Sequence, residues 1–126
     1  MKRIIFLIAF AFYSGFGFTQ GWNHRFGGTG QESNYKVIIC ADGGFVSVGS
    51  TTSFGFTEDL FVHKTDSLGK FVWQKFIGGN GIEKGYAAAE DATGNLYVVG
   101  ETNSTGAGGK DFYVVKLSSS GNILWT

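Results

Sequence analysis

The chain has 126 residues, and its 10 lysines and arginines balance its 10 aspartates and glutamates, so the formal net charge at pH 7 is +0. That balance excludes the basic stripe that a nucleic-acid-binding protein places against phosphates. A content of 43% hydrophobic and 16% charged residues excludes a disordered tail, and 21 glycines with no proline favour a β protein with many tight turns.

The first 19 residues have the pattern of a secretory signal peptide. Lys2 and Arg3 form a short basic start, and residues 4–18 are uncharged and almost wholly apolar. Small residues follow, which predicts cleavage before Gln20. The apolar run is shorter than the roughly 20 residues that span a membrane. We therefore expect residues 1–19 to be removed and the mature chain to be secreted or held at the cell surface, without a membrane span.

The rest of the chain, residues 20–126, contains one unit twice. Trp22, Trp73 and Trp125 are spaced 51 and 52 residues apart, and the sequence between them recurs. The segment DLFVHKTDSLGKFVW of the first copy, for example, corresponds to DFYVVKLSSSGNILW of the second. A period of about 50 residues is typical of propellers and related arrays. The expected boundaries are 22–72 for repeat one and 73–126 for repeat two, whose last strand is cut short.

Each unit has the pattern of four short strands. Turns that contain glycine separate short apolar runs, as in hairpins. Runs such as Leu96–Val99 are apolar on both faces, which suits sheets with neighbours on each side. In the second unit the expected strands are Tyr86–Ala92, Leu96–Thr102, Asp111–Leu117 and Ile123 onward, with turns at 93–95 and 118–122 and a longer loop at 103–110. The first unit has corresponding turns at 42–44 and 66–70 and a loop at 52–58.

Four antiparallel strands per unit, stacked face to face on the next unit, form the blade of a β-propeller. The expected fold is therefore all-β, with two tandem four-stranded antiparallel propeller-type blades. Residues Trp22–Phe26 precede the first complete blade and are expected to form a strand outside it. Cys40 is the only cysteine, so it can form no intramolecular disulfide and is expected to be a small buried hydrophobe.

Four motifs recur in the same order in both units. They are W-x-x-x-[FI]-G-G-x-G-x-E, [LF]-[YV]-x-V-G-x-T, D-[LF]-[FY]-V-x-K and G-x-x-x-W. In this order the chain resembles the bacterial β-propeller repeat family, whose repeats are of the seven-bladed propeller type, and the resemblance covers residues 22–126. It implies a propeller fold in a secreted or cell-surface protein, often of Bacteroidetes-type bacteria. It implies almost nothing about activity.

Two blades cannot close a ring, because propellers typically have four to eight. Faces as apolar as residues 45–48 would then stay exposed and favour association. We therefore expect the chain to be the N-terminal fragment of a larger β-propeller, with its partners being further blades in cis. The alternative is a short protein that completes its ring by self-association in trans.

The repeated glycine and acidic residues are interpreted as structural. The loops GGTG at 27–30 and GGNG at 78–81 lie between strands, whereas a phosphate-binding loop leads into a helix. A catalytic pair is asymmetric and occurs once, whereas the acidic residues recur. An aspartate at the start of a strand usually caps loop amides, so capping is favoured over calcium binding or acid–base chemistry. The repeated carboxylates are Asp59, Asp111, Glu32 and Glu83.

The remaining candidates give weaker signals. His24 and His63 lack further ligands at metal spacing, and His63 is expected at an ordinary strand position. Trp73 and Trp125 could stack on a sugar, but packing between blades is favoured. Two short sequences match glycosylation patterns, and whether they are modified is left open: Asp66-Ser67-Leu68, which matches an O-glycosylation tripeptide of some Bacteroidetes, and the sequon Asn103-Ser104-Thr105.

The sequence predicts no catalytic residue, no cofactor and no metal site, and it leaves the ligand open. We expect an exported, non-enzymatic β-propeller repeat module that acts as a scaffold or as an adhesion or ligand-binding surface for a protein or a glycan. One alternative is a carbohydrate-binding lectin formed when two-blade chains oligomerise. The other is a fragment of a propeller-based hydrolase or lyase whose catalytic residues lie outside this sequence.

Overall fold

The computed structural model describes residues 21, 23–55 and 57–126, so the expected signal peptide and Trp22 lie outside the described residues. These residues form strands and turns, and among them there is no helix long and apolar enough to cross a membrane. The strands are β1 (Glu32–Ile39), β2 (Phe45–Thr51), β3 (Asp59–Thr65), β4 (Phe71–Ile77), β5 (Glu83–Glu90), β6 (Leu96–Thr102), β7 (Asp111–Leu117) and β8 (Ile123–Trp125).

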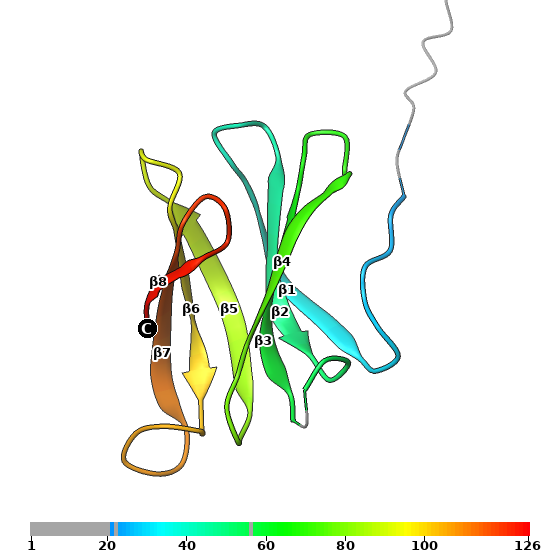
Figure 1. The fold of residues 1–126 in the computed structure, drawn as a ribbon. Coiled ribbons are helices and arrows are strands. Elements are labelled where there is room, and N and C mark those ends of the chain that lie inside the picture. Colours follow the sequence, from blue (N-terminus) through cyan, green and yellow to red (C-terminus); the bar gives the residue numbers. More distant parts are fainter. Residues whose placement is uncertain (1–20, 22, 56) are drawn as a thin grey trace, which may run out of the picture.

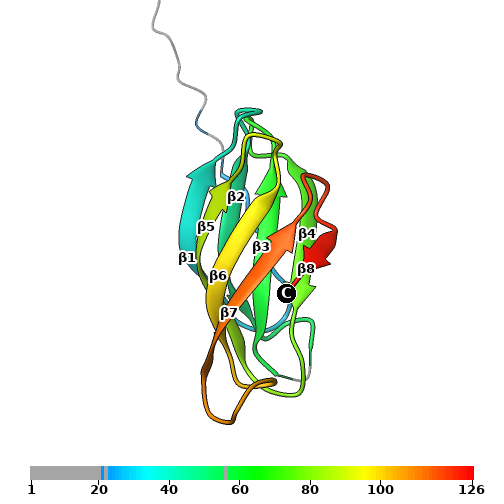
Figure 2. The ribbon, with the colours of Figure 1, turned by 90° about the vertical axis from the view of Figure 1, so that its left-hand side faces the viewer.

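The strands form two four-stranded antiparallel sheets in chain order. Sheet 1 has the order β1-β2-β3-β4 and sheet 2 the order β5-β6-β7-β8. The sheets stand face to face, with β5 packed against β1, β2 and β3 (Figure 1). Seen from the side of sheet 2, its strands cross in front of those of sheet 1 (Figure 2). The expected all-β fold of two tandem four-stranded sheets is confirmed, and the ring is not closed.

The four tight hairpins, which join β1–β2, β3–β4, β5–β6 and β7–β8, use one turn geometry, which explains why their positions could be predicted. In each, the first turn residue accepts a hydrogen bond from the amide three residues later and donates one to the carbonyl four residues later. The amide at the third step belongs to a glycine with φ between 76° and 82°. Glycine adopts this left-handed conformation without steric cost. The glycines are Gly43, Gly69, Gly94 and Gly121.

Replacement of Gly94 with valine is expected to destabilise the β5–β6 hairpin. Gly94 has φ of +81°, and the nearest atom to a Cβ built there, Cβ of Ser119, is 3.4 Å away. The cost therefore comes from backbone conformation, at about 1–2 kcal/mol for an L residue and more for a β-branched one. Thermal unfolding of Gly94→Val against Gly94→Asn, which tolerates positive φ better, measures it. Equal midpoints for Gly94→Val and the parent would contradict the turn assignment.

Each sheet has an irregularity at the same place in its first strand. The register shifts between Asn34 and Lys36 in β1 and between Gly85 and Ala87 in β5, which is 51 residues later. One residue is left out of the pairing at each bulge, and both are tyrosines whose rings meet edge to face with centroids 5.3 Å apart. The bulge lets β5 start at Glu83 instead of Tyr86, where the pattern of apolar residues placed the strand start.

The two sheets pack head to tail. Sheet 1 presents Val46, Val48, Leu60 and Val62 to sheet 2, and all are at most 1% exposed. Sheet 2 packs with the opposite face. Its residues that are equivalent to the packed residues of sheet 1 therefore point away from sheet 1. The contact is heterologous, because the two sheets contribute different faces to it. One face of each kind stays uncovered by the other sheet, namely the outer face of sheet 1 and the outer face of sheet 2. The buried residues of sheet 2 are Leu96, Val98, Val115 and Leu117, and Cys40 joins the same core as expected.

Polar contacts tie the sheets together around this core. Lys84 of β5 forms an ion pair with Glu58 at 2.9 Å, and the amide of Glu83 donates to the Glu58 carbonyl at 2.8 Å. At the other end the Glu90 carboxylate accepts from the amide of Ala41 at 2.6 Å. These bonds fix the lateral position of one sheet on the other, because apolar packing by itself is not directional.

The expected strand at Trp22–Phe26 is wrong for its described part, since residues 23–26 form no strand. The segment does not run along the edge of a sheet, where backbone groups could pair. It lies instead on the side of sheet 1 that faces away from sheet 2 (Figure 1), and the Phe26 ring packs on His63 with centroids 3.9 Å apart. An isolated segment gains more here by covering apolar surface than by forming a single strand.

Candidate functional site

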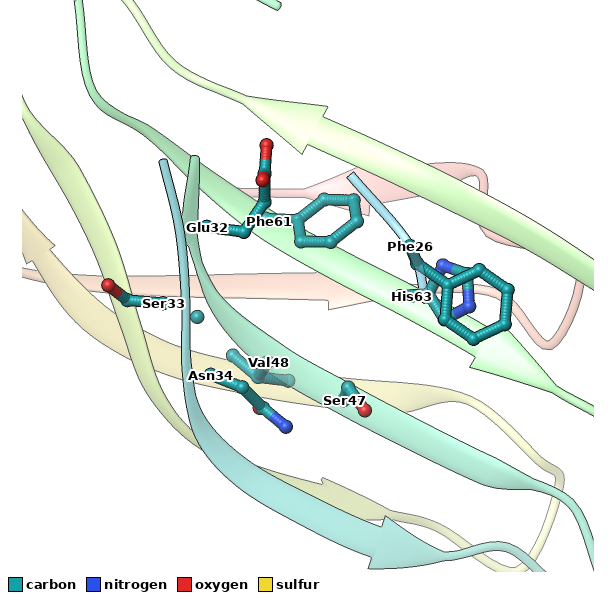
Figure 3. A pocket seen from close by; sticks show the side chains of 9 residues that line it. Phe26, Glu32, Ser33, Asn34, Ser47, Val48, Phe61 and His63 are labelled. Atoms are coloured by element: carbon teal, nitrogen blue, oxygen red, sulfur yellow. The ribbon is translucent and has the colours of Figure 1, made fainter. Parts of the chain in front are cut away.

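A pocket of about 240 Å³ opens on the outer face of sheet 1, which is the face turned away from sheet 2. The N-terminal segment forms one wall through Phe26, and the strands supply the floor (Figure 3). Its lining combines two aromatic rings with short polar side chains. The lining residues include Phe26, Glu32, Asn34, Ser47, Phe61 and His63.

His63 is the most unusual group in this pocket. Its side chain is 3% exposed, and neither Nδ1 nor Nε2 has a hydrogen-bond partner among the described residues. The imidazole lies among aromatic rings, with centroids 5.6 Å from Phe71 and 5.9 Å from Phe61 in addition to the contact with Phe26. Burial lowers the pKa of His63 below its ordinary value of 6.5. The strand position was expected from the sequence, whereas the two unsatisfied nitrogens were not.

His63 is expected to make the stability of the chain fall as the pH drops below 6.5. Since its pKa is lowered by folding, the unfolded chain binds the proton first, and stability is lost from the ordinary value down to the folded pKa. Each unit of lowering corresponds to about 1.4 kcal/mol. Urea unfolding at several pH values measures the loss. Among the described lining residues the only other titratable one is Glu32, and its pKa is lowered, so His63→Leu should remove the loss of stability that begins near the ordinary pKa of 6.5.

Glu32 and Glu83 make equivalent structural bonds in the two sheets. Glu32 accepts from the amide of Gly28 at 3.1 Å and from the hydroxyls of Thr51 and Ser53. These bonds, with that from Ser53 foremost, lower the pKa of Glu32. Glu83, four residues after Gly79, accepts from that amide at 2.8 Å and from the Thr102 hydroxyl at 2.5 Å.

The glycine loops are therefore held by carboxylates, which repel phosphate. This agrees with their interpretation as turns between strands. The same hydrogen bonds also occupy the two repeated glutamates, so these side chains are not free to act as an acid and base pair.

Asp59 and Asp111 do not have the capping role that was expected of them. No described loop amide donates to either carboxylate. Burial, followed by the charge of Glu83, raises the pKa of Asp59. Oδ2 of Asp111 is buried and has no hydrogen-bond partner among the described residues. The glutamates cap the loops instead, because their longer side chains reach amides four residues back along the chain.

The outer face of sheet 2 is open and carries apolar residues next to charged ones, since the strand register also places Lys84, Glu101 and Lys116 on it. It presents Val99, Phe112 and Val114, and the Phe112 side chain is 78% exposed. A shallow hollow of about 480 Å³ lies beside Phe112, with the Glu101–Lys110 ion pair at 2.7 Å on its rim. Figure 2 looks onto this face, where no other element covers β6 and β7.

The repeated tryptophans differ in their surroundings. Trp73 packs between the sheets as expected, because its Nε1 donates to the carbonyl of Ser119 at 3.0 Å and its ring lies over Gly121. Trp125 is 47% exposed and meets the ring of Tyr97 edge to face, with centroids 6.1 Å apart. Of these two described tryptophans, Trp125 is therefore the one that could offer a ring face to a ligand.

The other candidates of the sequence have ordinary roles. His24 stacks on Phe26 with centroids 6.2 Å apart. The described residues contain no group of three or more histidine, cysteine, aspartate or glutamate side chains that could hold a metal ion. In the sequon, Oδ1 of Asn103 accepts from the amide of Ile82 at 2.5 Å. Leu68 of the other glycosylation match is 71% exposed at the tip of the β3–β4 hairpin.

No protein-family profile matches the chain, and no curated protein is similar to it in sequence.

Proposed function

We propose that this chain is an exported, non-enzymatic module of the β-propeller repeat type that works as a scaffold or binding surface. The observation that carries the proposal is the head-to-tail packing of two equivalent sheets, which leaves Phe112 exposed beside Val99 and Val114 on an uncovered face of sheet 2. Monomeric proteins seldom expose a large contiguous apolar patch unless it serves an interaction. The function of the module is then to hold a partner on that face.

The bonding of the repeated acidic residues supports a module without enzymatic activity. Glu32 and Glu83 make the same structural bonds in both units, and Asp59 is enclosed near the junction between the sheets. An active site needs groups with different roles in one place, and equivalent groups with equivalent bonds do not supply this.

Two measurements test the proposal: the N-terminal sequence of the exported protein and its enzymatic activity on a panel of substrates. N-terminal sequencing of the protein recovered outside the cytoplasm should begin at or near Gln20. The same material should hydrolyse or eliminate none of a panel of glycoside, ester and polyuronate substrates. Turnover that survives further purification and is lost in an Asp59→Asn or Asp111→Asn variant would overturn the non-enzymatic assignment.

A lectin is the second candidate, because Trp125 is 47% exposed and meets the ring of Tyr97 edge to face on the open part of sheet 2. Aromatic faces of this kind stack on the apolar faces of sugar rings. Binding on a glycan array that is lost in Trp125→Ala but kept in Trp73→Phe would favour the lectin. If no glycan on the array is bound, the scaffold function is favoured over the lectin.

A further inference from the structure

The pocket on the outer face of sheet 1 exists because one position of the sheet has no side chain. Gly49 pairs with Asn34 of β1 and with Phe61 of β3, so the row across the three strands has a gap at its centre. A Cβ built on Gly49 would collide with the carbonyl oxygen of Ser33, so the bulge in β1 requires glycine there. The Phe26 ring forms a wall beside this gap (Figure 3). The pocket is therefore built into the strand register.

Three polar residues that line this pocket have no polar counterpart in sheet 2. The pairing within the sheets places Gly85, Val98 and Val115 at the positions that Asn34, Ser47 and His63 have in sheet 1. Val98 and Val115 are fully buried in the core. A residue type that the fold itself required would recur, because the two units are built alike. The polar set is therefore specific to sheet 1 and is not needed for the strands to form.

His63 is the member of this set whose hydrogen bonding is incomplete. Its side chain is 3% exposed, and neither ring nitrogen has a hydrogen-bond partner among the described residues. Burial lowers its pKa, so the imidazole is neutral at neutral pH and has one acceptor nitrogen and one N–H donor. Buried polar atoms are normally hydrogen-bonded. The exception indicates a partner that reaches His63 from the pocket.

The volume of the pocket limits the size of that partner. It is about 240 Å³, whereas one water molecule takes up about 30 Å³ of the liquid. A single bridging water would therefore leave most of the pocket empty. Sites for drug-sized ligands begin at about 300 Å³. The pocket thus suits a compound with one ring.

The charges around the pocket favour a neutral ligand. Among the described lining residues there is no lysine or arginine, and Glu32 supplies the one charge. An anion such as a carboxylate or phosphate would be repelled by this carboxylate. Glu32 also accepts hydrogen bonds from the amide of Gly28 and from the hydroxyls of Thr51 and Ser53. It is therefore engaged by the loop and is a poor partner for a cationic ligand.

The apolar part of the lining favours an aromatic ring. Phe26 and Phe61 both line the pocket, and their ring centroids lie 3.9 and 5.9 Å from that of His63. Aromatic rings prefer stacked or edge-to-face contacts with one another, which add to the gain from buried area. A phenolic hydroxyl is uncharged at neutral pH and can donate to an imidazole nitrogen.

The geometry points to a binding site for a small neutral phenol, whose ring packs against Phe26 and Phe61 and whose hydroxyl donates to the unprotonated nitrogen of His63. A free phenol and a tyrosine side chain share this chemistry. The site goes beyond the proposed function, because it lies on sheet 1 whereas the exposed Phe112 lies on sheet 2. Each can therefore fail without the other.

The test compares phenol with toluene, which has a methyl group in place of the hydroxyl. Each is titrated into the full exported chain, and binding is followed through the ¹⁵N resonances of the His63 ring. We expect phenol to bind with a Kd of about 1 mM or below. Toluene should bind at least about tenfold more weakly, because it leaves the buried nitrogen unpaired. Benzoate and glucose should not bind.

Two variants identify the groups responsible. His63→Val places at this position the residue that sheet 2 has there, and backbone amide resonances report binding to it. This variant should lose the preference for phenol over toluene. Phe26→Ala leaves the sheet unchanged and should weaken both ligands by about threefold or more while keeping the preference. The controls Trp125→Ala and Phe112→Ser should bind phenol within about twofold of the parent, because both residues belong to sheet 2.

The same titration with N-acetyltyrosinamide identifies the source of the phenol. Binding as tight as that of phenol would support a tyrosine side chain, and binding more than about tenfold weaker would support a free phenol. Equal affinities of phenol and toluene for the parent would overturn the role of His63. The site itself is overturned if about 10 mM phenol shifts no resonance of the pocket. Tighter binding of glucose or benzoate than of phenol would overturn the ligand class.

Discussion

Replacement of Gly85 with valine is expected to separate the two sheets. The added Cβ alone would lie 2.4 Å from Cγ1 of Val48, and the two methyl groups would reach further into a core whose members Val48 and Leu60 are at most 1% exposed. Overpacking of a dense core costs about 1–3 kcal/mol and occasionally more. Since both sheets would have to move apart, we expect a loss of about 3 kcal/mol or more in urea unfolding.

The chain provides its own control for this substitution. Asn34 occupies the equivalent position in sheet 1, but its side chain lies on the outer face and is exposed. Asn34→Val should therefore change the free energy of unfolding by about 0.5 kcal/mol or less, as exposed substitutions usually do. If Gly85→Val and Asn34→Val have the same unfolding midpoint in urea, the packing of sheet 1 on sheet 2 is not as described.

The strands and hairpins could be predicted because their determinants are local. Each turn has a glycine at the residue that must adopt positive φ, and at the turn starting at Asp91 the carboxylate accepts bonds from the amides of Thr93 and Asn95. These bonds, with that from the Thr93 side chain foremost, strongly lower the pKa of Asp91. These determinants lie within four or five consecutive residues, so they can be recognised in a single sequence.

The features that could not be predicted depend on residues far apart in the chain. Nothing near His63 in the sequence shows that Phe26 will cover it, and nothing near Asp111 shows that Oδ2 will be buried without a partner. The expected strand at 22–26 failed for the same reason, since strand formation needs an edge that only the complete sheet defines. The recurrence of Glu32 and Glu83 was visible, but their capping of glycine amides four residues earlier required the loop geometry.

Gly100→Ala is expected to be among the most damaging of the small substitutions. Gly100 pairs with Gly85 beside the β5 bulge, and a Cβ built on it would lie 1.8 Å from the carbonyl oxygen of Lys84. This neighbour is backbone, so no side-chain rotation relieves the contact. The strand pairing itself would have to open at the point where β5 also contacts sheet 1. We expect a loss of about 3 kcal/mol or more, or failure to fold.

Comparison with Gly94→Ala distinguishes the stability lost through steric contact from the stability lost through an unfavourable backbone conformation. Gly94 has positive φ and room for a Cβ, whose nearest neighbour would be Cβ of Ser119 at 3.4 Å, whereas Gly100 lacks the space and is not among the glycines with positive φ. Gly94→Ala should cost about 1 kcal/mol, well below the cost of Gly100→Ala. Gly49 has the same contact in sheet 1, where a Cβ would lie 1.7 Å from the carbonyl oxygen of Ser33, so Gly49→Ala should be equally damaging. Urea unfolding of the three variants decides this, and a Gly100→Ala variant as stable as Gly94→Ala would show that the bulge can move to make room.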